Sequence, residues 1–308
     1  MNAEHPQRGD FRVTLLGTGH PYPSPLRFGP SVLVEAGSQR LVVDAGRGVT
    51  IRLWQLEIPL SAIDRLLLTH YHSDHVNGLP DLWLTGWLPP VWAGARKTPF
   101  RVIGPTGASH LMSKLEEAYS ADIAIRVVDE NIPREGIATI VEEFDRDGVI
   151  YEKDGLKVTA FEVDHGEVIK PCYGYRFDYR GRSAVLSSDT RYNANVIKYG
   201  MGADLLVHEV AAVRPELLSE PGIVHIMDHH TSPQDAGRVF AQTRPKLAAY
   251  THMVLLASPR VPALTPDDVV AATRETYDGP LVIGEDLMSF EIGETVTVRK
   301  FAAGTVAV

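Results

Sequence analysis

Residues 69–75 read Thr-His-Tyr-His-Ser-Asp-His and follow an apolar run, Ile63 to Leu68, that is typical of a buried strand. Residues two apart in an extended segment point the same way. His70 and His72 are therefore expected to project together from the end of this strand. The rest of the sequence is interpreted around this stretch.

The chain is expected to turn at Asp74 and His75 into a helix over Val76 to Leu88, and both side chains can then reach a point near the first two histidines. Imidazoles with a carboxylate suit zinc, manganese or iron, and the absence of cysteine ligands argues against a closed structural zinc site. A polar turn that is merely rich in histidine is the alternative. Three histidines and an aspartate within six positions favour the metal site.

Four later apolar runs also end in a polar side chain that can bind metal or transfer a proton, namely His165, Asp189, Glu209 and His252. A lone histidine of this kind is more often a structural residue. Repetition at strand ends favours a site, because layered α/β folds build their sites where strands end. Asp44 ends another strand and either orients a ligand or caps the segment that follows.

Strand-like and helix-like patterns alternate along the 308 residues, which predicts a layered α/β fold. An apolar content of 44% is sufficient for a sizeable core. We expect a single domain over residues 1–308. The charged segment 121–155, with short β-like pieces such as Ile123 to Val128, is expected to be an edge insertion with a solvated face.

The formal net charge of -9 disfavours a broad nucleic-acid-binding surface, which requires basic side chains. The single cysteine, Cys172, cannot form an intrachain disulfide, and this composition fits a reducing, cytoplasmic location. No apolar run is long enough to span a bilayer, so no membrane contact is expected. An exported protein whose leader had been removed would have the same sequence, so export is the alternative to a cytoplasmic location.

The His-x-His-x-Asp-His sequence after an apolar strand resembles the signature of the metallo-β-lactamase fold superfamily. Within it, the chain looks most like the ribonuclease Z and arylsulfatase branch. The motifs that match this branch are Gly17-Thr18-Gly19, Asp44-Ala45-Gly46, Ser188-Asp189-Thr190, His208-Glu209 and His230-Thr231-Ser232. The run Gly78 to Leu82, with Gly104-Pro105 beyond it, is similar to the arylsulfatase-like members. Serine at position 188 departs from the glycine usual in the branch.

The resemblance implies an αββα sandwich with two divalent metal ions at one edge, zinc by preference and manganese or iron as alternatives. It implies a role for each of seven ligands: His70, His72 and His165 hold one ion, Asp74, His75 and His252 hold the other, and Asp189 bridges both. Hydrolysis by attack of a metal-bound hydroxide is then expected, because two such ions activate water and stabilise both the attacking and the leaving oxygen.

The resemblance also implies that Glu209 orients His230, which protonates the leaving oxygen. Together with Asp74, these two are the expected catalytic residues. His229 is adjacent, but the His-Thr-Ser sequence before the next helix favours position 230. Four other histidines have no matching role and are expected to be structural or surface residues: His20, His110, His208 and His225.

The expected substrate is a small sulfate or phosphate (di)ester, cleaved in an arylsulfatase-like reaction. The tRNA-processing members carry a long arm between the histidine equivalent to His165 and the bridging aspartate, and here only residues 166–188 lie between them. Nucleic acid is therefore disfavoured as a partner. A ribonuclease Z-type RNA 3′-end endonuclease and a lactone or other small-molecule hydrolase are the alternatives on the same core. Two further hypotheses are an iron-dependent redox enzyme and a noncatalytic binding protein.

Three tryptophans, Trp83, Trp87 and Trp92, lie near the end of the helix expected after the metal motif. The first two are one helical turn apart and share a face. They form either an apolar wall suited to an aromatic substrate or part of the core or a subunit contact. The resemblance also implies a homodimer.

Overall fold

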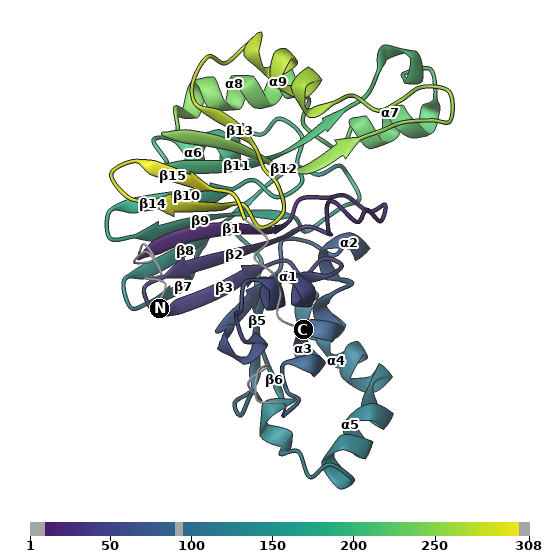
Figure 1. Cartoon of the computed structure of the whole chain (residues 1–308), viewed down its shortest axis with the longest axis vertical. Helices are drawn as coiled ribbons and strands as arrows, with labels where there is room; N and C mark the ends of the chain where they lie inside the picture. Colours follow the sequence, from purple (N-terminus) through teal and green to yellow (C-terminus); the bar gives the residue numbers. More distant parts are fainter. Residues whose placement is uncertain (1–9, 90–94, 302–308) are drawn as a thin grey trace, which may run out of the picture.

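Two mixed β-sheets pack face to face, and helices cover the outer face of each sheet (Figure 1). The computed structural model describes residues 10–89 and 95–301. Among these residues the first sheet has eight strands, in the spatial order β15 (Val296–Arg299), β14 (Ser289–Ile292), β1 (Phe11–Gly17), β2 (Ser31–Ala36), β3 (Gln39–Val43), β4 (Arg65–Leu67), β5 (Phe100–Pro105) and β6 (Thr139–Phe144).

The second sheet has seven strands within the described ranges, in the order β13 (Leu281–Ile283), β12 (Leu247–Leu255), β11 (Leu205–Ala212), β10 (Arg182–Leu186), β9 (Tyr173–Tyr179), β8 (Leu156–Glu162) and β7 (Gly148–Lys153). Strands β3 to β6 are parallel to one another, as are β10 to β13. The carboxyl ends of parallel strands lie at the same edge of a sheet, and this edge carries the motifs described above.

Three apolar layers hold the sheets and helices together. Alternate side chains of both sheets, including Leu15, Val43, Phe177 and Val207, form the layer between the sheets. The other two layers lie between each sheet and its helices. The described helices are α1 (Val49–Gln55), α2 (Ser73–Val76), α3 (Leu79–Thr85), α4 (Ala108–Ala118), α5 (Ser120–Val128), α6 (Ala194–Gly200), α7 (Pro221–Met227), α8 (Pro233–Thr243) and α9 (Pro266–Arg274).

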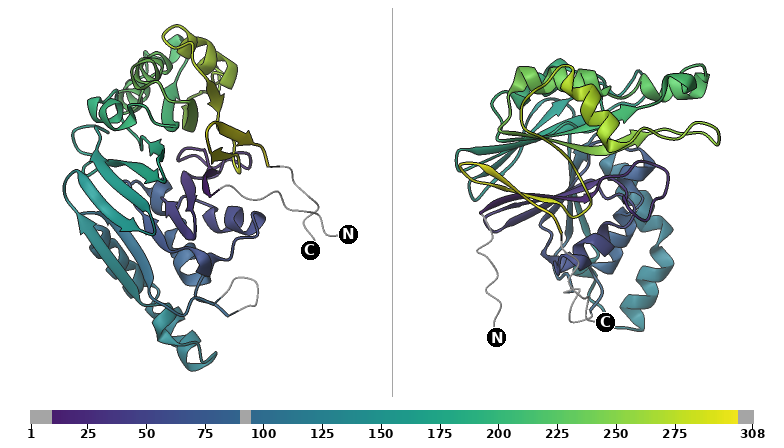
Figure 2. Two further views of the ribbon diagram at one scale, coloured as in Figure 1. Left: turned by 90° about the vertical axis from the view of Figure 1, so that its left-hand side faces the viewer. Right: turned by 45° about the horizontal axis from the view of Figure 1, so that its top comes forward.

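This arrangement is the predicted αββα sandwich. Figure 2 shows the two sheets stacked, with α1 and α3 to α5 outside the first sheet and α6, α8 and α9 outside the second. Short 3₁₀ turns at Leu60–Ala62, Arg134–Gly136 and Pro215–Leu217 complete the connections.

The predicted β-like piece at Ile123 to Val128 is wrong, because these residues belong to helix α5. Its β-branched residues favour strands, but packing decides the outcome. Ile123 is buried in the layer below the first sheet, and Arg126 pairs with Asp122 and Glu130, four residues away on either side. The rest of the charged segment supplies β6 and β7, the edge strands of the first and second sheets.

The single helix predicted from Val76 to Leu88 is also wrong, because α2 and α3 are separated at Asn77-Gly78. Gly78 lies so close to the loop after β3 that a Cβ here would be 2.3 Å from the carbonyl oxygen of Gly46. The two helices therefore separate at Gly78, the residue that packs closely against this loop. This close approach involves residues 32 positions apart and has no local signature.

Trp83 and Trp87 are core residues, with 0% and 1% of their surface exposed. Their indole nitrogens donate to the backbone oxygens of Ile137 (2.9 Å) and Pro133 (2.8 Å). The core-packing alternative is therefore right for these two side chains, and they do not form a wall beside the site. Trp92 lies outside the described residues.

Candidate metal centre

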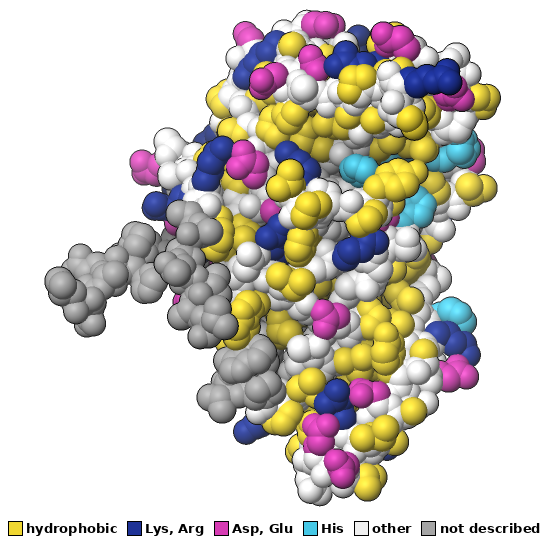
Figure 3. All heavy atoms as spheres, turned by 45° about the vertical axis from the view of Figure 1, so that its right-hand side comes forward, with side chains coloured by type: hydrophobic (Ala, Val, Ile, Leu, Met, Phe, Trp, Pro, Cys, Tyr) yellow, Lys and Arg dark blue, Asp and Glu magenta, His cyan; other side chains and the backbone are white. Residues whose placement is uncertain are grey.

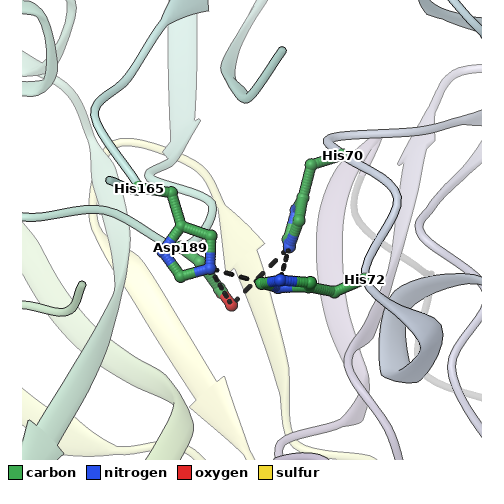
Figure 4. A group of neighbouring side chains, drawn as sticks. All are labelled: His70, His72, His165 and Asp189. Atoms are coloured by element: carbon green, nitrogen blue, oxygen red, sulfur yellow. Dashed lines mark hydrogen bonds and ion pairs between the residues drawn. The ribbon is translucent and has the colours of Figure 1, made fainter. Parts of the chain in front are cut away.

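The sequence-predicted site residues come together where the strands of both sheets end. His70 and His72 follow β4, His165 follows β8, and Asp189 follows β10. Their side chains converge on one point, as Figure 4 shows. The Nδ1 atom of His72 lies 3.1 Å from His70 Nε2 and 3.2 Å from His165 Nε2.

A second cluster lies beside the first and consists of Asp74, His75 and His252. His252 Nε2 is 3.3 Å from a carboxylate oxygen of Asp74. Asp189 connects the two clusters, because its Oδ2 atom is 3.3 Å from the Nε2 atoms of both His75 and His252. The same oxygen is 3.9 Å from His70 Nε2 and 3.7 Å from His165 Nε2.

His252 reaches the site because β12 bulges at this residue. The register between β11 and β12 shifts so that Glu209 pairs with Thr251 while Val210 pairs with Met253. His252 is the extra residue, and its φ of 41° lies in the left-handed region. Such a bulge redirects a side chain from the face of a sheet, here toward the metal clusters.

Hydrogen bonds on the far side of the ring fix the orientation of two imidazoles, those of His75 and His165. Asp44 accepts from His75 Nδ1 at 2.7 Å and from the backbone N–H of Thr69 at 2.8 Å. His165 Nδ1 donates to the backbone oxygen of His229 at 2.8 Å. The opposite ring nitrogens face Asp189, and in the neutral ring they carry the lone pair that can bind a metal.

The first cluster fits a divalent cation because its imidazoles are neutral. Burial and the nearby His75 lower the pKa of His70 well below its ordinary value. Burial likewise lowers the pKa of His165 to about 4, although Asp189 opposes this shift. Nitrogen lone pairs that face one another at 3.1–3.2 Å repel unless a proton or a cation lies between them.

The second cluster fits a cation because it attracts positive charge. Burial alone would lower the pKa of His75, but Asp189 and Asp44 reverse this and raise it well above its ordinary value. Burial favours the protonated form of Asp189, yet His252 and His75 hold its pKa well below the usual range. His75 Nε2 is buried without a hydrogen-bond partner among the described residues. A cation between these groups satisfies the nitrogen and the carboxylates together.

Glu209 and His230 lie next to the metal ligands. His230 Nδ1 is 3.2 Å from a carboxylate oxygen of Glu209, whose other oxygen accepts from the backbone N–H of Thr231 at 2.8 Å. Burial alone would lower the pKa of His230, but Glu209 overcomes this and raises it to about 9. His230 is therefore protonated at neutral pH and can donate a proton from its other nitrogen. Ser232 caps α8 directly after this segment, as predicted, and so fixes where the segment ends.

A cavity of about 190 Å³ opens over the clusters and reaches residues with no predicted role in the site. His20, Pro21 and Tyr22 line it from the loop after β1, and Ile226 lines it from α7. His20 is therefore part of the site wall. It follows the Gly17-Thr18-Gly19 turn at the end of a strand, which is the same signal that identified the other ligands.

Comparison with known proteins agrees with this geometry. The sequence profile of the beta-lactamase superfamily domain matches residues 39–253. A protein named ribonuclease Z from Mycobacterium marinum is 34% identical over 288 residues, which are 92% of this chain and 99% of that protein. A ribonuclease Z from Mycolicibacterium gilvum is 34% identical over 295 residues, covering 94% of this chain and 99% of the relative.

Solved structures share the fold. The metallo-beta-lactamase fold protein YhfI from Bacillus subtilis superposes with a TM-score of 0.70 at 18% identity, covering 92% of this chain and 99% of that one. The short form of human tRNase Z gives a TM-score of 0.65 at 21% identity, covering 90% of this chain and 98% of that one.

Among the described residues, the helices are all too short or too polar to span a membrane.

These findings confirm the predicted family, and they support the ribonuclease Z alternative better than the arylsulfatase-like prediction. The metal-binding clusters found in the structure are those expected of the fold, without indicating which metal they hold. The profile match spans more than half of the sequence, and the relatives match over nearly their whole length. The chain therefore belongs to the beta-lactamase superfamily and is a hydrolase of the metallo-β-lactamase fold.

Proposed function

We propose that this protein is a metal-dependent phosphodiesterase of the ribonuclease Z kind, which cuts RNA near a 3′ end. The observation that carries this proposal is the 34% identity to a ribonuclease Z over 99% of the length of that relative. The short segment between His165 and Asp189 does not separate this chain from that relative. The 288 aligned residues are nearly the whole of that protein and leave little room for a long additional arm.

His70, His72 and His165 would hold one divalent ion, and Asp74, His75 and His252 would hold the other. Asp189 would contact both, because its Oδ2 atom faces nitrogens of both clusters at 3.3–3.9 Å. When bound, such a pair of ions withdraws charge from a phosphoryl group and makes water a stronger nucleophile.

The protein's own contribution to the reaction is orientation and proton transfer. Asp44, Thr69 and the backbone oxygen of His229 fix the ligand imidazoles before substrate arrives. Glu209 holds His230 by its Nδ1 atom, so that His230 can donate a proton to the oxygen that leaves when the phosphorus–oxygen bond breaks. The charge of Glu209 keeps His230 protonated before this step.

A small phosphodiester is the second candidate substrate, and the size of the cavity favours it. A volume of about 190 Å³ is below the roughly 300–1,000 Å³ of pockets that enclose a whole drug-sized ligand. The net charge of -9 also disfavours extensive contact with an RNA backbone. An RNA substrate would therefore enter the cavity by one or two nucleotides only.

The experiment is cleavage of a precursor tRNA with a 3′ trailer by protein loaded with zinc or manganese. Bis(4-nitrophenyl) phosphate and 4-nitrophenyl sulfate serve as parallel substrates. We expect a 3′-hydroxyl on the tRNA product. The Asp189→Ala variant, prepared in the same way, controls for contaminating nuclease.

Cleavage of the small phosphodiester but not of the precursor would move the assignment to the second candidate. Turnover of the sulfate ester alone would contradict both phosphodiester assignments. An inactive protein that nevertheless contains two ions per chain would contradict the hydrolase role proposed for His230 and Glu209.

A further inference from the structure

The cavity over the metal clusters has a second part that none of the expected metal ligands forms. Tyr22 lines it from the loop after β1, Ile226 from α7, and Val254 and Leu256 from the end of β12 and just beyond. These side chains are apolar or aromatic, whereas the other part is lined by imidazoles and carboxylates. Ile226, Val254 and Leu256 belong to one hydrophobic cluster, and together with Tyr22 they are termed the apolar end of the cavity.

The apolar end is built on a small hydrophobic cluster separate from the main core. Val254 and Leu256 are buried in this cluster, and Ile226 packs against it while still lining the cavity. Figure 3 shows histidine side chains reaching the surface among hydrophobic ones on this face of the molecule. An apolar surface beside a polar site is typical of pockets that bind the nonpolar part of a ligand.

Tyr22 is a large aromatic side chain with 65% of its surface exposed. Its ring lies edge-on to the ring of His20, with 5.6 Å between the ring centres. An exposed tyrosine beside a cavity offers a flat face for another ring to stack on, and stacking of this kind contributes to recognition of nucleobases.

The loop that carries Tyr22 is held firmly in place. Asp286 accepts hydrogen bonds from the backbone N–H groups of Thr18 (2.9 Å) and Phe28 (2.7 Å), which lie at the two ends of this loop. Arg27 donates to the Thr18 hydroxyl at 2.6 Å and to the backbone oxygen of Gly284 at 2.8 Å. Both ends of the loop that carries Tyr22 are thus fixed without substrate, which limits the conformations that the loop loses when Tyr22 contacts a ligand.

From this arrangement we propose that the apolar end of the cavity is a subsite for a planar ring joined to the phosphoryl group that binds at the metal clusters. Tyr22 and Ile226 contact the ring. The ring is either a nucleobase of the RNA or the aryl group of a small ester, since both present the same flat apolar face. This inference rests on the proposed function and names the group that the same site recognises.

The test is direct binding, measured by isothermal titration calorimetry on metal-loaded protein. Uridine 5′-monophosphate, phenyl phosphate and methyl phosphate are compared, because all three carry a phosphate and only methyl phosphate lacks a ring. We expect at least one ring-bearing ligand to bind about 5- to 150-fold more tightly than methyl phosphate, the range given by removal of a stacking aromatic. A gain for uridine monophosphate points to a nucleobase, and a gain for phenyl phosphate alone points to an aryl ester.

Variants then show which residues cause the tighter binding of the ring-bearing ligands. Tyr22→Ala and Ile226→Ala should each reduce it while leaving methyl phosphate binding unchanged, and Tyr22→Phe should keep it. Leu26→Ala is the matched control, because Leu26 lies on the same loop, is 81% exposed and does not line the cavity. Folding of each variant is checked by circular dichroism.

Equal binding of the three ligands, or binding of none, would overturn the subsite. So would a Tyr22→Ala variant that weakens methyl phosphate as much as the others. None of these measurements requires turnover, so a protein that fails to cut RNA can still support the subsite. A protein that cuts RNA but shows no preference for a ring would refute the subsite alone.

Discussion

Asp189 is the side chain shared by the two metal clusters. Its Oδ2 atom faces two imidazole nitrogens of each cluster, and its side chain is buried. The Ser188 residue before it has a φ of 60°, in the left-handed region that glycine adopts most readily. The backbone therefore accepts an unfavourable conformation here to aim one carboxylate between the clusters.

We predict that Asp189→Ala loses metal and activity together. Removing the carboxylate leaves facing imidazole nitrogens without the negative charge that offsets two cations. Metal content measured by inductively coupled plasma mass spectrometry should fall from two ions per chain to one or fewer. Glu142→Gln, at the far edge of the first sheet, serves as the control and should retain both ions. If the Asp189→Ala protein still contained two ions, Asp189 would not be the ligand that the two clusters share.

His230→Ala should behave differently, because this residue is assigned to proton transfer. We expect metal content to stay at the wild-type level while kcat falls by about 10²- to 10⁴-fold, the usual contribution of a general acid. The loss should be smaller for 4-nitrophenyl esters, whose leaving group needs little protonation, than for RNA. A metal-free His230→Ala protein would place this histidine among the ligands, since it also lies near Asp189 and His252.

At this scale the sequence predicted which side chains come together. His70, His165 and Asp189 follow strands that end where the apolar run ends, whereas Glu209 and His252 lie inside β11 and β12, which continue to Ala212 and Leu255. The sequence did not reveal how His252 is aimed, since the bulge depends on the pairing of β12 with β11. It also missed Tyr22 and Ile226, which have no metal-binding chemistry. Asp286 was missed too, although it follows shortly after β13 and holds both ends of the loop that carries Tyr22.

Among the elements, α5 and the interrupted α2–α3 pair show why local pattern failed. The β-branched residues of α5 favour a strand, but burial of Ile123 in the apolar layer that covers the first sheet and the Arg126 ion pairs stabilise a helix. The break between α2 and α3 follows from contact of Gly78 with Gly46. In both cases a tertiary contact, of Ile123 with the apolar layer or of Gly78 with Gly46, opposes the local preference, whereas strands such as β9 and β10 satisfy local and global preferences at once.

Helix α4 offers a prediction at the scale of an element. Its N-terminus is capped from β6, because one oxygen of Glu143 accepts from the backbone N–H groups of Gly107 (3.0 Å) and Ser109 (2.7 Å). We predict that Glu143→Gln lowers the free energy of unfolding at pH 7 by about 0.5–1 kcal/mol, as loss of a charge at a helix N-terminus does. Urea denaturation measures the change.

The pH dependence of this effect follows from the pKa of Glu143. The hydrogen bond from the Ser109 backbone N–H lowers that pKa from its ordinary value of 4.5 in the folded state. A depressed pKa contributes stability above the unfolded value, and the contribution is lost as the pH falls through the folded value. The difference in the free energy of unfolding between Glu143→Gln and the wild type should therefore become smaller below about pH 4.5. Glu116→Gln, near the other end of α4, should show no such loss at pH 7.

Across the whole molecule, the metal clusters join the two sheets. His70, His72, Asp74 and His75 follow a strand of the first sheet. His165 and Asp189 follow strands of the second sheet, and His252 lies at the bulge within β12 of the second sheet. Each cluster contains members of both groups. Bound cations would therefore link the two sheets at one edge. At this edge the apolar layer between the sheets ends and polar side chains begin.

We predict that chelation lowers the melting temperature and that added zinc or manganese restores it. A ligand that binds only the folded state at 100 times its dissociation constant stabilises by about 2.7 kcal/mol, so two ions should raise the melting temperature by on the order of 10 °C. Differential scanning calorimetry with and without chelator measures this shift, with metal analysis of each sample. Because Asp189 faces both clusters, added metal should raise the melting temperature of the Asp189→Ala protein by at most half as much as that of the wild type. If chelated wild-type protein lost its ions yet melted unchanged, the two sheets would be held by their apolar interface alone, and the metals would serve the reaction without supporting the fold.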